Sequence, residues 1–280
     1  MPGFGSTPPA LVGRDAEFAD IEAMVDRVGR GIYEQPRLLT GERGMGKTAL
    51  LIEVSVWARD RGLWLVELQA AETGDVMPQL MRDLRRQLLE HDRDARVGEV
   101  VARAVRVLSS FTLTYGSSVK LDLEREPGRA DTGDLATDLG DVLSEVCLAA
   151  RAAGTVVVVS IEQIQKMPAR QLEALLSAVQ RVYRDRSDPE AVLPLVLLAA
   201  GLPSALDAIR DLGGTFGERV RVHALELLSQ PETIDALATP TSQRDVSWEP
   251  AALEALARKT GGWPLAVQQY GYEAWNAGNR

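Results

Sequence analysis

The stretch "RLLTGERGMGKTALLIEVSVWARDRG", residues 37–62, decides the fold of this chain. A short apolar run ends at Thr40, and apolar residues then recur at helical spacing from Leu50 to Trp57. A glycine-rich loop separates the two patterns. The stretch therefore predicts a strand, a loop and a helix, in that order.

The loop, residues 41–48, matches the eight-residue P-loop pattern at every position. Its glycines let backbone amides turn inward, and these amides and the helix N-terminus form a concave anion site for phosphates. We expect the Lys47 ammonium to reach the β- and γ-phosphate oxygens and the Thr48 hydroxyl to ligate Mg²⁺. A chance glycine-rich turn is disfavoured because the spacing, the Lys-Thr pair and the flanking elements agree. The residues expected to bind the nucleotide here are Gly41, Glu42, Arg43, Gly44, Met45, Gly46, Lys47, Thr48 and Ala49.

Strand and helix patterns alternate along the first 225 residues. Near-continuous apolar strands separated by amphipathic helices indicate a parallel sheet covered on both faces. We therefore predict an α/β fold with a five-stranded parallel P-loop NTPase core. The further strands are expected at residues 63–70, 155–161, 193–201 and 219–225, and helices near 75–90, 134–152, 168–184 and 203–211.

Two segments depart from this alternation. Within an insertion at about 97–132, the stretch "FTLTYGSSVKLDLE", residues 111–124, has two alternating runs around a turn and predicts an inserted β-hairpin. After residue 225 the strands stop and three helical patterns follow, with prolines where a first helical turn tolerates them. We predict a nucleotide-binding domain of residues 1–225 and a small helical domain of residues 226–280.

Composition excludes several classes of protein. A chain of 280 residues that is 45% hydrophobic can bury a full core, and its net charge of -9 argues against a surface that grips nucleic acid throughout. The sequence has neither a signal-peptide pattern nor an apolar run of about 18 residues, so we expect no membrane association. Cys147 is the only cysteine and His91 and His223 lack metal-site spacing, which indicates a reduced cytoplasmic setting without a structural metal.

Besides the P-loop, six stretches follow one another in a recognisable order: "LVGRDAEF" (11–18), "TGDLATDLGDVLSEVCLAARAAG" (132–154), "VVVVSIEQIQ" (156–165), "LPLVLLAAGLPS" (193–204), "TFGERVRV" (215–222) and "TGGWPLAVQQYGYEAW" (260–275). In these stretches the chain resembles AAA+ and STAND-type P-loop ATPases of the origin-recognition and archaeal-ATPase group over most of its length. This resemblance implies ATP or ADP and Mg²⁺ as ligands, with Val12, Gly13 and Arg14 beside the adenine and the C-terminal helices as a lid over the base.

The third strand ends in Glu162 and Gln163, where the resemblance leads us to expect Asp-Glu, the Walker B pair. In the family the first acid holds Mg²⁺ through water, and Glu162 keeps that charge on a longer side chain. The second acid activates the attacking water, and the Gln163 amide cannot accept a proton. Losing a general base costs about 10²- to 10⁴-fold in rate, so we predict a nucleotide binder with slow turnover. The alternatives are a strand end that only makes local hydrogen bonds, or a substitution at Gln163 that traps ATP.

Two further positions bear on hydrolysis. After the fourth strand Ala199, Ala200 and Gly201 offer no side chain to contact the γ-phosphate, which supports weak hydrolysis unless Ser204 or a backbone group substitutes. Arg219 resembles the family arginine that acts as a finger on a neighbouring subunit, although an arginine at this place is also typical of a solvated helix cap.

Three functions remain open. The first is a Mg-ATP-dependent switch read by a protein partner. The second is an active ATPase motor that works as a homo-oligomer with Arg219 acting in trans, which the altered acid pair disfavours. The third is a DNA-binding initiator, which the acidic balance disfavours. Relatives commonly continue into a DNA-reading winged-helix domain, so we expect DNA contacts only through such a domain.

Overall fold

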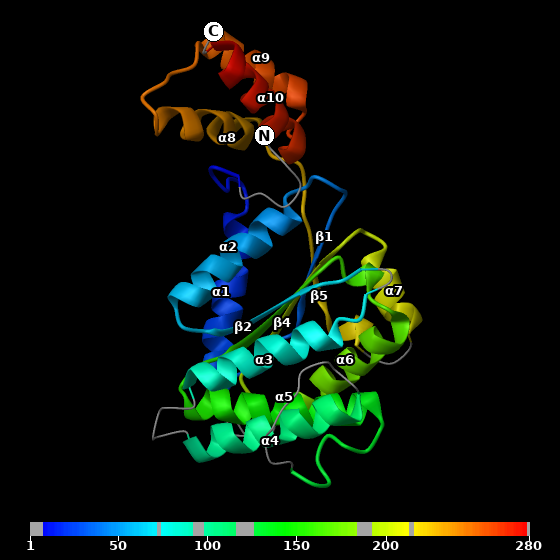
Figure 1. Cartoon of the computed structure of the whole chain (residues 1–280). Coiled ribbons are helices and arrows are strands. Elements are labelled where there is room, and N and C mark those ends of the chain that lie inside the picture. Colours follow the sequence, from blue (N-terminus) through cyan, green and yellow to red (C-terminus); the bar gives the residue numbers. More distant parts are fainter. Residues whose placement is uncertain are drawn as a thin grey trace.

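The computed structural model describes residues 8–71, 74–91, 98–115, 126–183, 192–212 and 216–278. Figure 1 shows a central sheet with helices on both sides and a helical region at one end. The sheet has five strands in the order β2-β3-β4-β1-β5, and every neighbouring pair is parallel, as predicted. The strands are β1 (Arg37–Thr40), β2 (Trp64–Gln69), β3 (Val157–Glu162), β4 (Leu195–Gly201) and β5 (Arg221–Ala224).

Two layers of helices cover the sheet because alternate strand residues face opposite sides. Val157 and Val159 of β3 pack in the core under α3, α5 and α6, whereas Val158 packs in the core under α1 and α2 (Figure 1). The helix α4 packs on α3 and α5. The α-helices of this body are α1 (Asp15–Gly29), α2 (Lys47–Asp60), α3 (Met77–His91), α4 (Gly98–Thr114), α5 (Leu135–Ala152), α6 (Ala169–Val182) and α7 (Ala205–Asp211), and two short 3₁₀ helices are η1 (Ile164–Lys166) and η2 (Gly217–Arg219).

The predicted β-hairpin is wrong in its first arm. Residues 111–114 form the last turn of α4, and Phe111 is buried in the core. The hydroxyls of Ser109 and Thr112 donate to the carbonyls four residues earlier, at 2.7 and 2.9 Å, as in a continuing helix. The alternation of apolar and polar residues at 111–114 was misleading, because these residues also continue the helical spacing of apolar residues in α4. The predicted second arm, like the turn at 116–118, lies outside the described residues.

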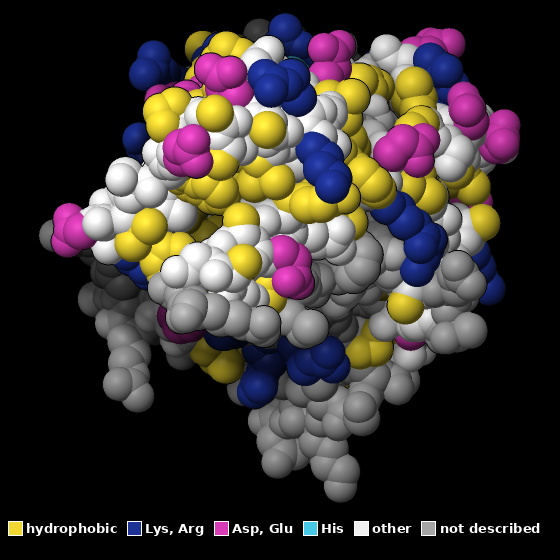
Figure 2. Space-filling view, turned by 90° about the horizontal axis from the view of Figure 1, so that it is seen from above, with side chains coloured by type: hydrophobic (Ala, Val, Ile, Leu, Met, Phe, Trp, Pro, Cys, Tyr) yellow, Lys and Arg dark blue, Asp and Glu magenta, His cyan; other side chains and the backbone are white. Residues whose placement is uncertain are grey.

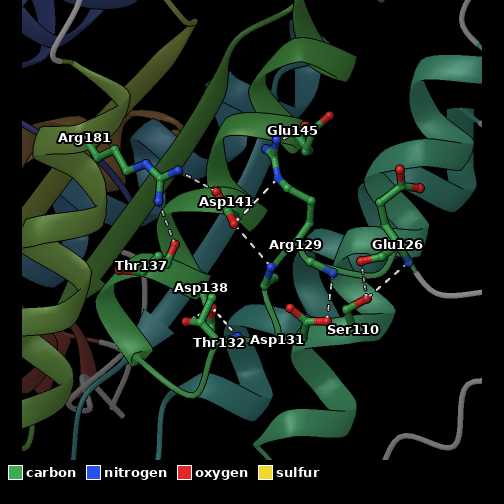
Figure 3. A network of polar contacts seen from close by, with 12 residues as sticks. Ser110, Glu126, Arg129, Asp131, Thr132, Thr137, Asp138, Asp141, Glu145 and Arg181 are labelled. Atoms are coloured by element: carbon green, nitrogen blue, oxygen red, sulfur yellow. Dashed lines mark hydrogen bonds and ion pairs between the residues drawn. The ribbon is translucent and has the colours of Figure 1, made fainter.

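Buried acids on α5 hold the segment that precedes this helix (Figure 3). Asp138, Asp141 and Glu145 share one helix face because they are three and four residues apart. Asp138 accepts hydrogen bonds from the Thr132 amide at 3.0 Å and the Thr132 hydroxyl at 2.6 Å. Arg129 donates to Glu145 at 2.9 Å and lies 3.6 Å from Asp141. The burial of these charges is therefore compensated by partners.

Three helices form the C-terminal region, which we call the lid: α8 (Gln230–Ser242), α9 (Pro250–Thr260) and α10 (Pro264–Gly278). A capping box of Ser229 and Glu232 starts α8, and prolines lie at the start of each helix as predicted. Its core is small, and Figure 2, which looks onto this end, shows hydrophobic side chains exposed between charged ones. Among the described residues, every helix is too short or too polar to span a membrane.

Candidate functional site

A cavity of about 510 Å³ lies where the ends of β2, β3 and β4 meet the P-loop, the N-terminal segment and the lid. It brings together most residues that the sequence predicted to bind nucleotide or metal, whereas Gly13, Gly41 and Glu42 lie outside its lining. The predicted residues that line it are Val12, Arg14, Arg43, Gly44, Met45, Gly46, Lys47, Thr48, Ala49, Glu162 and Gln163. Those that the sequence analysis missed include Leu11, Gln69, Gln165, Lys166, Leu228, Ala236, Pro264, Leu265, Val267 and Gln268.

The charged lining of the cavity is mainly positive. Arg14, Arg43, Lys47 and Lys166 contribute four cations, and Glu162 is the one carboxylate among the described residues that line it. The chain as a whole carries a net charge of -9, so this cavity reverses the sign of the overall charge. Such a concentration of positive charge favours a bound anion.

The P-loop turns its backbone around this positive region. Gly44 and Gly46 have φ angles of 83° and 89°, which favour glycine, and Gly46 precedes the first turn of α2. The Lys47 ammonium donates to the carbonyls of Gly41 at 2.6 Å and Glu42 at 2.8 Å. Burial lowers the pKa of Lys47, although the charges of Glu42 and Glu162 oppose this shift. A phosphate could replace these carbonyls as the partner of Lys47.

The two predicted metal ligands face each other. The hydroxyl of Thr48, in the first turn of α2, donates a hydrogen bond to Glu162 Oε1 at the end of β3. No group of three or more His, Cys, Asp or Glu residues suited to a metal occurs in the described parts of the chain. One hydroxyl and one carboxylate fit Mg²⁺, which is usually held by few protein oxygens together with waters and substrate phosphates.

The segment after β3 places amides at the cavity. Gln163 has a left-handed backbone with a φ angle of 55°, and it turns the chain from β3 into η1. Gln165 Oε1 accepts a hydrogen bond from the Leu202 amide at 3.3 Å. Gly201 also lines the cavity, whereas Ser204 is not in its lining. Ser204, the residue considered as a substitute for a polar side chain after β4, therefore lies outside the cavity lining.

Arg14 joins three segments around the cavity. Its Nη2 donates to the Met45 carbonyl at 3.1 Å and the Glu226 carbonyl at 2.7 Å, and its Nη1 donates to the Gly13 carbonyl at 2.9 Å. Burial lowers the pKa of Arg14, while the charges of Glu17 and Glu232 raise it. The guanidinium therefore braces the P-loop against the segment that leads to the lid, a role that sequence reasoning missed.

The lid contacts the backbone of the P-loop. Trp263 Nε1 donates to the Arg43 carbonyl at 3.1 Å, and the Leu265 amide donates to the Gly44 carbonyl at 3.1 Å. A Cβ added to Gly44 would lie 2.8 Å from both Leu265 Cβ and Trp263 Nε1, so the lid packs directly on this glycine. The sequence "GGWP" at 261–264 predicted a helix start but not this contact.

Arg219 lies away from the cavity. It is exposed and precedes β5, whose first residue, Arg221, pairs with Arg37 at the start of β1. The P-loop follows the opposite end of β1. Arg219 therefore lies near the amino ends of the strands, whereas this chain's own cavity lies at their carboxyl ends. Its predicted action on a neighbouring subunit stays a prediction.

A family model described as AAA ATPase domain matches residues 10–193. This range contains the P-loop, the end of β3 and the helices α1 to α6. None of the curated proteins compared with the chain matches it.

Solved structures resemble the chain at low sequence identity. The Aeropyrum pernix ORC2 protein in its ADP form is 18% identical with a TM-score of 0.58, covering 99% of this chain and 67% of that one. CDC6P from Pyrobaculum aerophilum is 13% identical with a TM-score of 0.54, covering 99% and 65%. A RuvB mutant of Thermotoga maritima is 16% identical with a TM-score of 0.50, covering 94% and 62%. The chain spans about two thirds of the length of these solved chains, and the similarity shows a shared fold.

Proposed function

Because this chain belongs to the AAA ATPase domain family, we propose that it is a nucleotide-dependent switch that binds Mg-ATP and hydrolyses it slowly. The single observation that carries the slow turnover is the position of Gln163 in the cavity lining beside Glu162. An amide there cannot take a proton from an attacking water. Glu162 is the one carboxylate among the described lining residues, and it is bonded to Thr48 on the metal side.

The loss of a base lowers the rate of hydrolysis more than the affinity for nucleotide. General-base catalysis contributes typically about 10²- to 10⁴-fold in rate. We expect nucleotide affinity to rest mainly on the P-loop amides and Lys47, and the loss of a base at residue 163 leaves both in place. A protein of this kind stays in its ATP-bound state for a long time, which suits a switch better than a motor.

Binding would rearrange the contacts that Lys47, Thr48 and Glu162 make. The Lys47 ammonium would exchange the Gly41 and Glu42 carbonyls for phosphate oxygens. Thr48 and Glu162 would separate so that their oxygens hold Mg²⁺ directly or through water. The metal, when bound, neutralises charge between the phosphates.

The lid is the element that reads this change. It hydrogen-bonds the carbonyls of Arg43 and Gly44, so a phosphate that reshapes the P-loop changes the partners of Trp263 and Leu265. Arg14 transmits the same change from Met45 to Glu226, just before α8. A ligand shifts such an equilibrium only by its differential affinity for the two lid positions. We infer that ATP and ADP differ in this respect and that a protein partner recognises one position.

Single-turnover hydrolysis of Mg-ATP tests the proposal. Wild-type protein should hydrolyse slowly, and Gln163→Glu should accelerate the step by at least about tenfold because a carboxylate can accept the proton. The double variant Glu162→Asp with Gln163→Glu tests whether the longer Glu162 side chain also limits the rate. Lys47→Ala is the control for ATP hydrolysis by contaminating enzymes. Hydrolysis by wild-type protein at about 1 s⁻¹ or faster, or no gain in either variant, would refute the slow switch.

A motor that works as a homo-oligomer is the second candidate, and the exposure of Arg219 favours it. An arginine supplied in trans contributes about 10³- to 10⁵-fold to related phosphoryl transfers. If the motor operates, the rate per chain should rise with protein concentration in wild type, and this dependence should vanish in Arg219→Ala. A rate that is independent of concentration in both proteins would exclude it.

A further inference from the structure

We propose that Gln165 detects the terminal phosphate of ATP and so distinguishes ATP from ADP. This inference rests on the proposed function, because it requires a nucleotide in the cavity. Its basis is the position of the Gln165 amide, which comes from the segment after β3 but lies at the end of the neighbouring strand β4. It fills the place where β4 itself carries no polar side chain.

The end of β4 has no room for a side chain of its own. Gly201 pairs in register with Thr40, the residue that directly precedes the P-loop. A Cβ added to Gly201 would lie 2.5 Å from Ala205 Cβ and 2.7 Å from Gln165 Oε1. The position next to the root of the P-loop is therefore occupied by Gln165 instead.

The hydrogen bond to Leu202 fixes the orientation of this amide. A backbone N–H can only donate, so the group that faces Leu202 N at 3.3 Å must be the carbonyl oxygen of Gln165. The Nε2 group then points away from Leu202 with two N–H donors. No described residue accepts a hydrogen bond from it, and Gln165 lines the cavity.

Free N–H donors beside a positive cavity match a phosphate oxygen. We expect the P-loop amides to hold the inner phosphates, so the Gln165 donor, which lies beside the end of β4, would meet the outermost phosphate, which ADP lacks. Gln165 also has a route to the rest of the molecule. The Leu202 carbonyl accepts from the Ala205 amide at 2.8 Å, at the first residue of α7. A phosphate that attracts Gln165 Nε2 therefore acts on the turn that starts α7.

The test is calorimetric titration of ADP and of an ATP analogue with a nonhydrolysable β–γ bridge. Gln165→Glu keeps an acceptor for Leu202 N–H but replaces the Nε2 donors by a charged oxygen. Its affinity for the ATP analogue should fall at least about tenfold, and its affinity for ADP should stay within about twofold. Gln165→Ala should show a smaller loss in the same direction.

Gln171→Ala is the matched control. The Gln171 Oε1 atom accepts a hydrogen bond from the Val76 amide at 3.2 Å, a bridge of the same kind as that of Gln165, but Gln171 does not line the cavity. The affinities of this variant for ADP and for the ATP analogue should equal those of wild type. Thermal unfolding without nucleotide should be the same in Gln165→Glu and wild type, which separates a lost phosphate contact from a damaged fold.

The outcomes separate this inference from the proposed function. If wild-type protein binds neither ligand, the proposed function fails and the inference fails with it. If wild-type protein binds both ligands but the Gln165 variants lose both equally, or lose neither, only the inference is overturned. A selective loss for the ATP analogue in Gln165→Glu, without one in Gln171→Ala, supports it.

Discussion

The hydroxyl of Thr48 donates a hydrogen bond to the carboxylate of Glu162, joining the first turn of α2 to the last residue of β3. Both groups were predicted to hold Mg²⁺, and they come from distant parts of the sequence. If Mg²⁺ binds here, the oxygen atoms of Thr48 and Glu162 would hold it, and the hydrogen bond between the two side chains would be lost. The affinity for ATP should therefore depend on Mg²⁺ through Glu162.

Glu162→Gln should reduce the affinity for Mg-ATP about tenfold, because groups that hold or orient metal ligands contribute about 10- to 100-fold to metal affinity. The affinity for ATP in the presence of a chelator should change little. Fluorescent-nucleotide titration with and without Mg²⁺ measures both. Glu67→Gln, which removes an exposed carboxylate paired with Arg59, is the control. Equal losses with and without Mg²⁺ would place Glu162 outside the metal site.

Lys47→Ala should weaken ATP binding by about 100-fold and leave the fold intact, because a charged hydrogen-bond donor to the terminal phosphates is lost. The Lys47 side chain is only half buried and contacts loop carbonyls rather than the core. Nucleotide titration combined with circular dichroism checks both statements. Lys259→Ala removes a lid lysine that lies 5.2 Å from the Tyr270 ring centre and should bind ATP normally. Unchanged affinity in a folded Lys47 variant would refute the P-loop assignment.

The N-terminal segment should contribute to nucleotide affinity in two ways that can be separated. Deleting residues 1–12 removes Val12 but keeps Arg14, so it should lower the affinity for adenine nucleotides more than that for tripolyphosphate. Arg14→Ala removes the hydrogen bonds to the Met45 and Glu226 carbonyls. It should lower the affinities for both ATP and tripolyphosphate, because it loosens the P-loop itself. Competition titrations with ATP and tripolyphosphate compare the two. Equal losses in the deletion variant would contradict the placement of Val12 beside the adenine.

The P-loop and the sheet could be predicted because their signals are local. A contiguous motif specifies the loop, and near-continuous apolar runs such as residues 156–161 specify buried parallel strands. The contacts of Arg14, Trp263 and Gln165 could not, since each joins segments far apart in the chain and depends on where the strands end. A lone Gln two residues after Gln163 has no sequence signal that separates it from a solvated turn.

The wrong assignment of residues 111–114 has a physical cause, and the burial of Asp138 and Asp141 is a feature that the sequence did not predict. Residues 111–114 alternate like a strand, but Phe111 and Leu108 continue the apolar face of α4, and the longer periodic pattern prevails. The acids Asp138 and Asp141 look like the solvent face of an amphipathic helix by composition. They are buried because the segment before α5 and basic side chains supply their partners.

Trp263→Phe should loosen the lid from the P-loop, because Phe keeps an aromatic ring but cannot donate to the Arg43 carbonyl. Amide exchange at Leu265, which donates to Gly44, should be about fivefold faster, the effect of a hydrogen bond worth about 1 kcal/mol. Trp248→Phe is the control, since Trp248 Nε1 donates to the Leu237 carbonyl inside the lid at the same 3.1 Å. It should speed exchange within α8 instead. Unchanged exchange at Leu265 in Trp263→Phe would contradict the coupling.

Arg37 is a charged residue at the start of β1, at the end of the strand opposite the P-loop. Its side chain is fully buried, and it donates to Asp20 at 2.6 Å and to Glu34 at 3.0 Å. Asp20 also lies 3.1 Å from Arg221 and 3.1 Å from His223 on β5. This carboxylate therefore ties α1 to β1 and β5.

Asp20→Asn should destabilise the protein by about 3 kcal/mol at pH 5, because it leaves the buried Arg37 with one anionic partner.

Burial raises the pKa of Asp20, but the hydrogen bond from Arg37 and the charges of Arg37, Arg221 and His223 outweigh it, so the pKa lies below the ordinary value of 3.8. A depressed pKa stabilises the fold above the unfolded-state value and loses this effect as the pH falls through the folded-state value. The difference in unfolding free energy between wild type and variant should thus shrink below pH 3.8. Urea unfolding at pH values from 5 downward measures this difference. Asp26→Asn, which loses an exposed pair with Arg61, should change stability by less than about 0.5 kcal/mol, and an equal effect of the two variants would show that Arg37 does not depend on Asp20.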